Sequence, residues 1–378
     1  MATSKVTPTR DTRQVADLLA SPEIVGLIAE LEATRWTGRP GYSIRTMVGM
    51  TLVKSLYVLP TWTRTAALVR DHAALRMVLG CPNNPPSHWA CYRFTAKMRE
   101  RSEALDRCLA NVLASLHAEM PEMGTNIAVD GSDLPAYANG QRFLSKGGRE
   151  RERYSDPDAS WGHRSAISTR KGGGYYGYKV HAAVCTTTGL PIAWTVETAR
   201  DSELQFVNQL LDAVTDHGFA PEYAMLDKGY DGRYVYEACA ARGMRPIIPL
   251  RKIIAGRADP PSCDHGVWTF AGSDTKRDAS KWRCPTAECS PASTWVKADR
   301  LHPLVPRETK RFRALYRQRG AVEREFGRLK HEWALLPLRV RRIERVRLHA
   351  NLSILGRLAV ALDRARAGHE THRLPSAA

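Results

Sequence analysis

An apolar run that ends at a carboxylate stands at residues 223–231, YAMLDKGYD. Its first four residues predict a short buried strand, and Asp227 follows them directly. The same arrangement occurs earlier, where Asp130 follows the apolar run 127–129. Ligands bind at the edge of an α/β sheet where its strands end, so two neighbouring strands would bring both aspartates together. Carboxylates this close repel each other unless a proton or a cation lies between them, and the pair is therefore a candidate divalent metal site.

A plainer interpretation of both aspartates is a turn. Asp130 precedes Gly131, and Asp227 lies two residues before Gly229. Aspartate and glycine are both common turn residues, so each segment taken alone fits a turn as well as a metal site.

The sequence around these runs alternates between strands and helices. Strands are expected at residues 126–129, 176–186, 192–198, 223–226 and 246–250. Apolar residues at helical spacing predict helices at 202–217 and 233–242. The early strands predict a hairpin meander, and the later alternation predicts β-α-β units. We therefore expect an α/β catalytic domain with a mixed sheet, formed by residues 121–250 and 306–365.

Residues 13–119 carry apolar residues at helical spacing, interrupted by short turns and prolines. Ser43 is expected as a helix N-cap, Thr61 or Thr63 is expected to cap the next helix, and a long helix is expected to start near Ser87. Lysines and arginines occur throughout these helices, which suits a small DNA-binding bundle over residues 1–120. A bundle that only packs on the rest of the chain or dimerises fits the pattern equally well, because helix-turn-helix units have no sharp spacing signature.

A strongly helical segment over residues 308–336 contains the pattern Y-x-x-R-x-x-x-E-x-x-x-x-x-x-K. At about 100° per residue, the four residues of this pattern fall within a sector of roughly 60° on one helix face: Tyr316, Arg319, Glu323 and Lys330. Apolar residues occupy the adjoining sector, so the helix can dock on the sheet and present its polar stripe beside it. Glu323 would complete the metal site, and the other three would contact DNA phosphates. An ordinary solvated helix face with an Arg319–Glu323 ion pair is the alternative.

The overall charge favours an acidic polymer such as nucleic acid as the partner, because Lys and Arg outnumber Asp and Glu by 56 to 39. No apolar run reaches the roughly 20 residues that span a membrane, and residues 1–13 begin polar, without a signal-peptide core. We therefore expect a cytosolic protein with no membrane partner and a loose tail at residues 366–378. Its eight cysteines should be thiols or metal ligands rather than disulfides.

A stretch rich in proline, glycine and charge at residues 251–305 predicts an insertion in the α/β domain. It holds three of the eight cysteines. Two pairs of soft ligands, Cys263 with His265 and Cys284 with Cys289, resemble a small structural zinc ribbon. Their spacings depart from the common Cys-x-x-Cys knuckle, so unpaired thiols are an equal alternative.

The pattern at residues 316–330 resembles the Tyr-Arg-Glu-Lys signature of bacterial insertion-sequence transposases of the DDE type. Asp130 in VDGS and Asp227 in LDKGYD are similar to the two earlier aspartates of that family, and all matched positions occur in its order. The resemblance covers residues 40–365. It implies a ribonuclease-H-like catalytic fold, with Asp130 on the first strand, Asp227 on the fourth and Glu323 on the helix after the insertion.

The same resemblance implies Mg²⁺ or Mn²⁺ as the cofactor and double-stranded DNA as the substrate, both as terminal inverted repeats and as target. In the two-metal scheme Asp130 would bridge both ions, and Asp227 and Glu323 would each favour one. A homodimer is the default expectation, because two DNA ends must be brought together. The expected location is the bacterial cytoplasm, on the nucleoid.

Two other functions fit the same residues. A transposase-derived but catalytically silent DNA-binding protein would share the resemblance, although the presence of all three carboxylates argues against it. A nuclease on the ribonuclease-H-like fold would apply the same metal chemistry to another polymer. Lys179 and His181 alternate on one expected strand and either contact substrate or form a satisfied polar pair, the simpler interpretation. The glycines at 172–174 are interpreted as a flexible loop.

Overall fold

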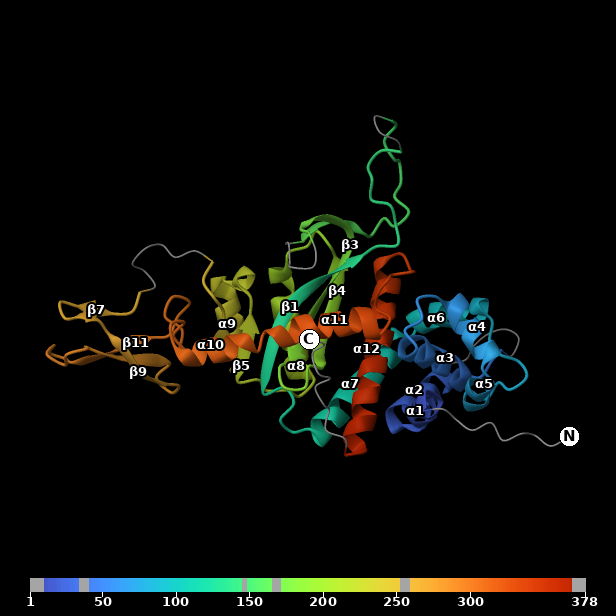
Figure 1. Ribbon diagram of the computed structural model, residues 1–378, viewed down its shortest axis with the longest axis horizontal. Helices are drawn as coiled ribbons and strands as arrows, with labels where there is room; N and C mark the ends of the chain where they lie inside the picture. The colour runs from blue at the N-terminus through green and yellow to red at the C-terminus, as the bar shows by residue number, and fades with distance from the viewer. Residues whose placement is uncertain (1–9, 34–40, 145–147, 165–170, 252–258, 369–378) are drawn as a thin grey trace.

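The computed structural model describes residues 10–33, 41–144, 148–164, 171–251 and 259–368. Three parts follow one another along the long axis of the molecule (Figure 1). A helical bundle formed by the first part of the chain lies at one end, a mixed sheet lies in the middle, and a small β-rich insertion lies at the opposite end. In the described ranges no helix is both long and apolar enough to cross a membrane.

Helices that precede the sheet form the bundle. They are α1 (Arg10–Ala20), α2 (Pro22–Ala33), α3 (Ile44–Leu56), α4 (Trp62–Asp71), α5 (Ala73–Val78), α6 (His88–Arg99) and α7 (Ser102–Glu119). The expected cap at Ser43 is confirmed, and of the two candidates Thr61 and Thr63 it is Thr61 that caps α4. Ser87 caps α6 near the expected start of that helix. Each of these three side chains accepts a hydrogen bond from the backbone N–H three residues later. These caps satisfy donors that a helix start leaves unpaired, so local sequence sets where the helices begin.

The central sheet is an antiparallel meander extended by parallel strands. Its strands are β1 (Asn126–Pro135), β2 (Ser160–Arg164), β3 (Gly173–Cys185), β4 (Pro191–Thr198), β5 (Tyr223–Leu226) and β6 (Arg245–Ile247). β3 pairs antiparallel with β1, β2 and β4, whereas β5 is parallel to β1 and β6 is parallel to β5. The connections after β4 and β5 are helical: η1 (Glu203–Phe206) with α8 (Val207–Asp216), and η2 (Lys228–Tyr230) with α9 (Arg233–Ala241). The predicted α/β class with a mixed, ribonuclease-H-like sheet is confirmed.

Helices cover the sheet and link it to the bundle. Residues 182–185 of β3 are all buried, which shows that both faces of this strand are covered. α8 packs on β3 and β4, and α11 (Gly320–Glu332) packs on β1 and β3. α12 (Ile343–Arg366) packs on β4 and also on α7 and α3. Trp194 Nε1 on β4 donates to Asn351 Oδ1 at 2.8 Å, so α12 joins the bundle and the sheet into one core.

The segment expected as one helix over residues 308–336 is two helices. α10 (Lys310–Arg317) ends before a turn at Gln318 and Arg319, and α11 begins at Gly320. The turn lets α10 pack against β6 while α11 lies on β1 and β3. The prediction that the whole signature lies on one helix face is therefore wrong, because Tyr316 belongs to α10.

Two strands are longer than predicted. β1 continues past Val129 to Pro135, because β3 pairs with it along this whole length, and Asp130 lies within the strand rather than at its end. Gly173 and Gly174, interpreted as loop, belong to β3 and pair with β2. The sequence did not predict β2 either, which follows the long connection after β1 and pairs with β3.

The insertion between β6 and α10 consists of short strands. They are β7 (Ser262–Cys263), β8 (Gly266–Val267), β9 (Thr269–Asp274), β10 (Ala279–Arg283) and β11 (Ser293–Lys297). β7 and β8 form a hairpin, and β9, β10 and β11 form an antiparallel sheet. Trp282 is buried against Phe270 in this sheet. The expected tail at 366–378 lies outside the described residues after Gly368.

Candidate active site

Asp130 and Asp227 occupy matching positions on the two central parallel strands. The last residues that pair β1 with β5 are Val129 and Leu226, and each aspartate is the next residue of the chain after them. β5 ends here, and β1 continues along β3. Because paired strands lie about 4.8 Å apart, this register places the two aspartates side by side at the edge of the sheet.

Asp130 is held by two hydrogen bonds in a partly enclosed position. Its Oδ1 accepts from the backbone N–H of Gly131 at 2.8 Å, and its Oδ2 accepts from Arg319 Nη1 at 2.9 Å. Burial raises the pKa of Asp130 to about 7, and the negative charge of Asp227 adds to this rise while Arg319 opposes it. Negative charge is therefore costly at this position unless a cation lies nearby.

Asp227 forms the turn that its sequence allows and follows β5 beside Asp130. Its side chain caps η2 by accepting a hydrogen bond from the backbone N–H of Gly229, which confirms the turn. The same turn carries Tyr230, which is buried and whose hydroxyl has no hydrogen-bond partner among the described residues. Burial raises the pKa of Tyr230, and the negative charges of Glu203, Asp130 and Asp227 add to the rise.

The turn between α10 and α11 brings Glu323 to the same edge. Arg319 stands in this turn and forms ion pairs with both Asp130 and Glu323. The ion pair of the alternative interpretation thus exists, but its arginine also reaches the sheet. The ring of Tyr316 stacks on Phe312 with centroids 6.1 Å apart, and the Arg319 guanidinium lies 5.8 Å from the Tyr316 centroid.

Lys330 ties the far end of α11 to β1. Its Nζ donates to Ser132 Oγ at 2.9 Å and lies 3.4 Å from Asp133 Oδ1. Asp133 Oδ2 in turn accepts from Arg164 Nη1 of β2 at 3.2 Å. Lys330 and Arg319 are thus both engaged within the protein, so a DNA phosphate would have to share or replace their present partners.

The donor set of this edge suits a hard divalent cation. Carboxylate oxygens are the ligands that Mg²⁺ and Mn²⁺ prefer, and the enclosed Asp130 needs the positive charge that such an ion brings. In the part of the chain that the structure describes, the oxygens of Asp130, Asp227 and Glu323 do not all lie within 4.8 Å of one another. Arg319 pairs with two of these carboxylates, those of Asp130 and Glu323.

Glu203 at the start of η1 is a neighbour of this site that sequence reasoning missed. It lies 3.3 Å from Lys179 Nζ, and its charge contributes to the raised pKa of Asp130. His181 is fully buried, its ring lies tilted against that of Phe206 with the centroids 4.9 Å apart, and its ring nitrogens have no hydrogen-bond partner in the described ranges. The expectation of a satisfied Lys179–His181 pair is therefore wrong. No motif marks Glu203, since only the return of η1 to the end of the sheet brings it here.

Comparison with known proteins assigns the family. Residues 122–357 match the family described as "Transposase DDE domain". Comparison with curated proteins finds no match. Among solved structures the chain is similar to the piggyBac transposase, seen in a synaptic complex with hairpin DNA, at 12% identity and a TM-score of 0.44, over 98% of this chain and 80% of that chain. The family match spans more than half of the chain and includes Asp130, Asp227 and Glu323, and the chain therefore belongs to the transposase DDE domain family.

Proposed function

We propose that this DDE transposase cleaves DNA at the ends of its own element and joins the 3′ ends to target DNA, with Asp130, Asp227 and Glu323 as ligands of two divalent metal ions. The observation that carries this assignment is the register of β1 and β5, which places the two aspartates side by side. Arg319 links this pair to Glu323. We further propose that the metal is Mg²⁺ or Mn²⁺ and that the element is a bacterial insertion sequence whose signature is formed by Tyr316, Arg319, Glu323 and Lys330.

The chain's own residues prepare this edge for phosphodiester chemistry. Bound metal ions would activate the attacking oxygen and stabilise the leaving oxygen. Arg319 would turn from its two carboxylates to a DNA phosphate once these carboxylates have another positive partner. Lys330, held by Ser132 and Asp133, fixes α11 on β1.

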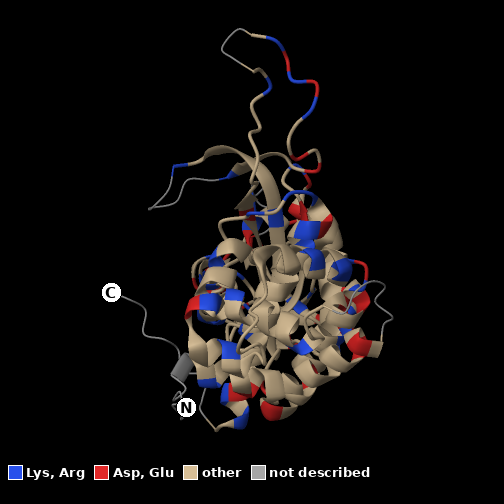
Figure 2. Ribbon diagram, turned by 90° about the vertical axis from the view of Figure 1, so that its right-hand side faces the viewer, with Lys and Arg blue, Asp and Glu red and all other residues tan. Residues whose placement is uncertain are grey.

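A group of basic residues lies where α12 begins, beside the bundle. Lys and Arg are interspersed with Asp and Glu over the bundle end of the molecule (Figure 2), so the charge excess forms no single stripe there. A cavity of about 330 Å³ between α3, α6 and α12 is lined, within the described ranges, by charged residues of one sign only, all of them cationic. Its cationic lining residues are Lys54, Arg99, Arg339, Arg341 and Arg345. We propose that this cavity, called the basic pocket below, holds phosphates of the DNA.

Two features of the basic pocket support this role. Lys54 lines the basic pocket and is only 8% exposed. Burial lowers the pKa of Lys54 to about 8, so a bound anion would stabilise the charged form of this side chain. The guanidinium groups of Arg339 and Arg341 lie 5.0 and 5.2 Å from the ring centroid of Tyr137. Tyr137 stands two residues after the end of β1, the strand that carries Asp130. DNA held in the pocket would therefore lie along the strand that leads to the candidate active site.

Arg345→Ala is expected to weaken DNA binding to all sequences alike. Arg345 is exposed and lines the basic pocket, so its loss removes one phosphate contact and should lower the slope of log affinity against log salt by about 0.9. Fluorescence anisotropy with an element end and with an unrelated duplex measures this slope. Arg70→Ala is the control, since Arg70 is exposed outside the pocket and pairs with Asp71. An unchanged slope in Arg345→Ala would remove the basic pocket from the DNA path.

Gly131→Ala is expected to reduce cleavage by on the order of 100-fold through misplacement of its neighbour Asp130. An added Cβ would lie 2.9 Å from His181 Nδ1 and 3.2 Å from Glu203 Oε1, so β1 or these side chains must move. Gly327→Ala on α11 is the control, because nothing lies within 4 Å of its added Cβ. It should keep its activity and gain up to about 1 kcal/mol in unfolding free energy. Equal cleavage by the two variants would contradict the crowding argument.

The function itself is tested with the wild-type protein and DNA that carries the element's own ends. We expect cleavage and joining in Mg²⁺ or Mn²⁺ and neither in excess chelator, because the proposed ligands act only through the ions. Binding without cleavage would favour the catalytically silent alternative. Hydrolysis without strand transfer would favour a nuclease. Analytical ultracentrifugation with paired ends tests the proposed homodimer, and the proposed place of action is the nucleoid, where the DNA lies.

A further inference from the structure

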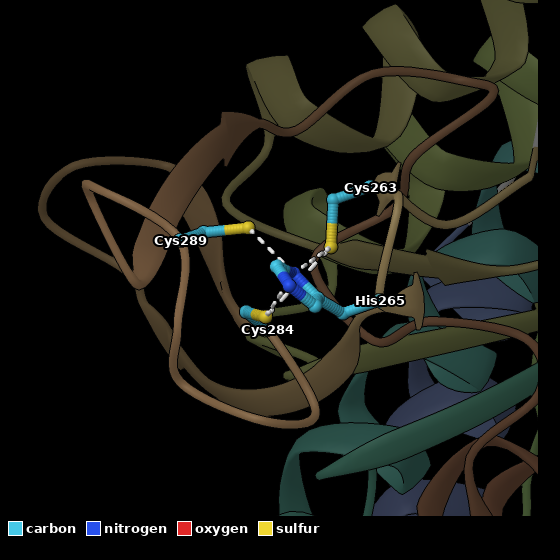
Figure 3. Close-up of side chains that lie close together, drawn as sticks. All are labelled: Cys263, His265, Cys284 and Cys289. Carbon is cyan, nitrogen blue, oxygen red and sulfur yellow. Dashed lines mark hydrogen bonds between the residues drawn. The ribbon is translucent and has the colours of Figure 1, made fainter.

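Four soft side chains of the insertion converge on one point (Figure 3). Cys263 ends β7, and His265 stands in the two-residue turn between β7 and β8. Cys284 follows β10 directly, and Cys289 lies in the connection from β10 to β11. Their ligand atoms all lie within 4.8 Å of one another, and in the described ranges no other set of three or more Cys, His, Asp and Glu does so. Two segments of the chain thus meet at a single cluster, called the Cys–His cluster below.

The distances in the Cys–His cluster match the edges of a zinc tetrahedron. Zinc lies about 2.3 Å from sulfur and about 2.0 Å from imidazole nitrogen, which in a tetrahedron puts two sulfurs about 3.8 Å apart and sulfur and nitrogen about 3.5 Å apart. The Sγ atoms of Cys263 and Cys284 are 3.7 Å apart. His265 Nδ1 lies 3.8 Å from Cys263 Sγ, 3.9 Å from Cys284 Sγ and 3.5 Å from Cys289 Sγ. All three cysteines are free thiols here, and the Cys263–Cys284 separation is well beyond the roughly 2.05 Å of a disulfide.

The surroundings of the Cys–His cluster orient its ligands. His265 turns Nδ1 to the three sulfurs, and its Nε2 lies 3.0 Å from Glu288 Oε2. A carboxylate on the outer nitrogen is the usual partner of a zinc-bound histidine, because it fixes the ring and the tautomer. Thr286 Oγ1 lies 3.5 Å from Cys284 Sγ and can donate to a thiolate there.

The β7–β8 hairpin has little else to hold it in place. Each of its strands is two residues long, and Val267 is 62% exposed. The small core of the insertion, around Trp282 and Phe270, lies in the other sheet. A segment with so small an apolar core gains its order from metal ligation rather than from burial.

We propose that the insertion binds one Zn²⁺ through Cys263 Sγ, His265 Nδ1, Cys284 Sγ and Cys289 Sγ, with Glu288 as the residue that positions His265. All four ligands come from the protein and no position is left for water or substrate, so the ion is structural. It fastens the β7–β8 hairpin to the end of β10. This site is separate from the proposed catalytic carboxylates and differs in its metal, because soft thiolates select zinc where oxygen ligands select Mg²⁺ or Mn²⁺.

The test measures metal content in the full-length protein purified without chelator. We expect one zinc per chain in the wild type by mass spectrometry, and less than about one tenth of this in Cys284→Ser and Cys289→Ser. Cys81→Ser, which changes a buried thiol of the bundle, is the control and should keep its zinc. A wild type that holds no zinc after supplementation, or that holds iron with sulfide instead, overturns the proposal. Because zinc is measured directly, failure of DNA cleavage has no bearing on the result.

A second pair of measurements covers the case in which the cysteine variants do not fold. Glu288→Gln keeps all four ligands and is expected to bind zinc 10- to 100-fold more weakly, as judged by competition with a chromogenic chelator. Cobalt exchanged into the wild type should show the visible absorption of a tetrahedral thiolate site. Unchanged zinc affinity in Glu288→Gln overturns the positioning role of Glu288, and an octahedral cobalt spectrum overturns the ligand set.

Discussion

Glu323→Gln is expected to lower DNA cleavage by on the order of 1,000-fold while binding of the element ends stays within about twofold of wild type. Glutamine keeps the shape of the side chain but removes the charge that a divalent ion needs. The Glu323 side chain is 44% exposed, so its substitution should not disturb the core. Single-turnover cleavage in Mg²⁺ measures the first effect, and fluorescence anisotropy measures the second. Cleavage at the wild-type rate would remove Glu323 from the site.

Glu325→Gln provides a matched control on the same helix. Glu325 stands two residues after Glu323, but its side chain is 0% exposed and pairs with Arg357 and Arg328 inside the protein. We expect this variant to be less stable, yet to cleave at the wild-type rate per folded molecule. Loss of cleavage in both folded variants would show that the position of α11, rather than the charge of Glu323, had been tested.

Arg357→Met is expected to lower the free energy of unfolding by about 3 to 5 kcal/mol, because it leaves a buried carboxylate without its main partner. Arg357 Nε lies 3.0 Å from Glu325 Oε1, and Arg328 Nη1 lies 3.5 Å from Glu325 Oε2. Burial raises the pKa of Glu325, and the two arginines oppose that rise. Urea denaturation of wild type and variant measures the difference.

Two further results separate lost charge compensation from lost packing in Arg357→Met. Replacing Glu325 by Leu in the same chain removes the stranded charge and should recover most of the stability. The deficit should also depend on pH. A carboxyl group whose pKa is higher in the folded than in the unfolded protein destabilises the fold as the pH rises above the pKa of the unfolded state. The loss of unfolding free energy in Arg357→Met should therefore be larger at pH 7 than near pH 5. A deficit independent of pH would instead point to the packing of Arg357 on Trp333.

Short elements with strong local signals could be predicted from the sequence. β5 has the predicted bounds, because four apolar residues followed by the turn residues Asp227 and Gly229 leave little choice of where the strand begins and ends. The helix starts at Ser43, Thr61 and Ser87 were equally accessible, since a cap depends on its own next three residues. The α/β class followed from the same local patterns.

Elements whose ends depend on distant partners could not be predicted in this way. Helical spacing continues through Gln318 and Arg319, and the break there reflects the packing of α10 on β6 and of α11 on β1. Glycine is common in turns, but the pairing of Gly131 with His181 keeps Gly131 in β1.

The candidate site shows the same division. Residue type and strand position were enough to single out Asp130 and Asp227 before their register was known. Helix periodicity put the four signature residues on one face, which the break between α10 and α11 rules out, and a helix face does not reveal the partner across it. The link from Arg319 to Asp130 and the approach of Glu203 therefore had no signal in the sequence.

The position of α12 between the bundle and the sheet affects how the chain can be made and divided. The first helices leave the ribosome long before α12, the helix that covers α7 and α3 and whose Arg366 pairs with Glu23 at 2.7 Å. During synthesis the bundle must therefore wait with an apolar face exposed, which invites chaperones and aggregation. A fragment that stops at residue 120 would keep this exposed face permanently. Studies of DNA binding by the bundle are better designed with the whole chain, or with α12 joined to the bundle through a linker.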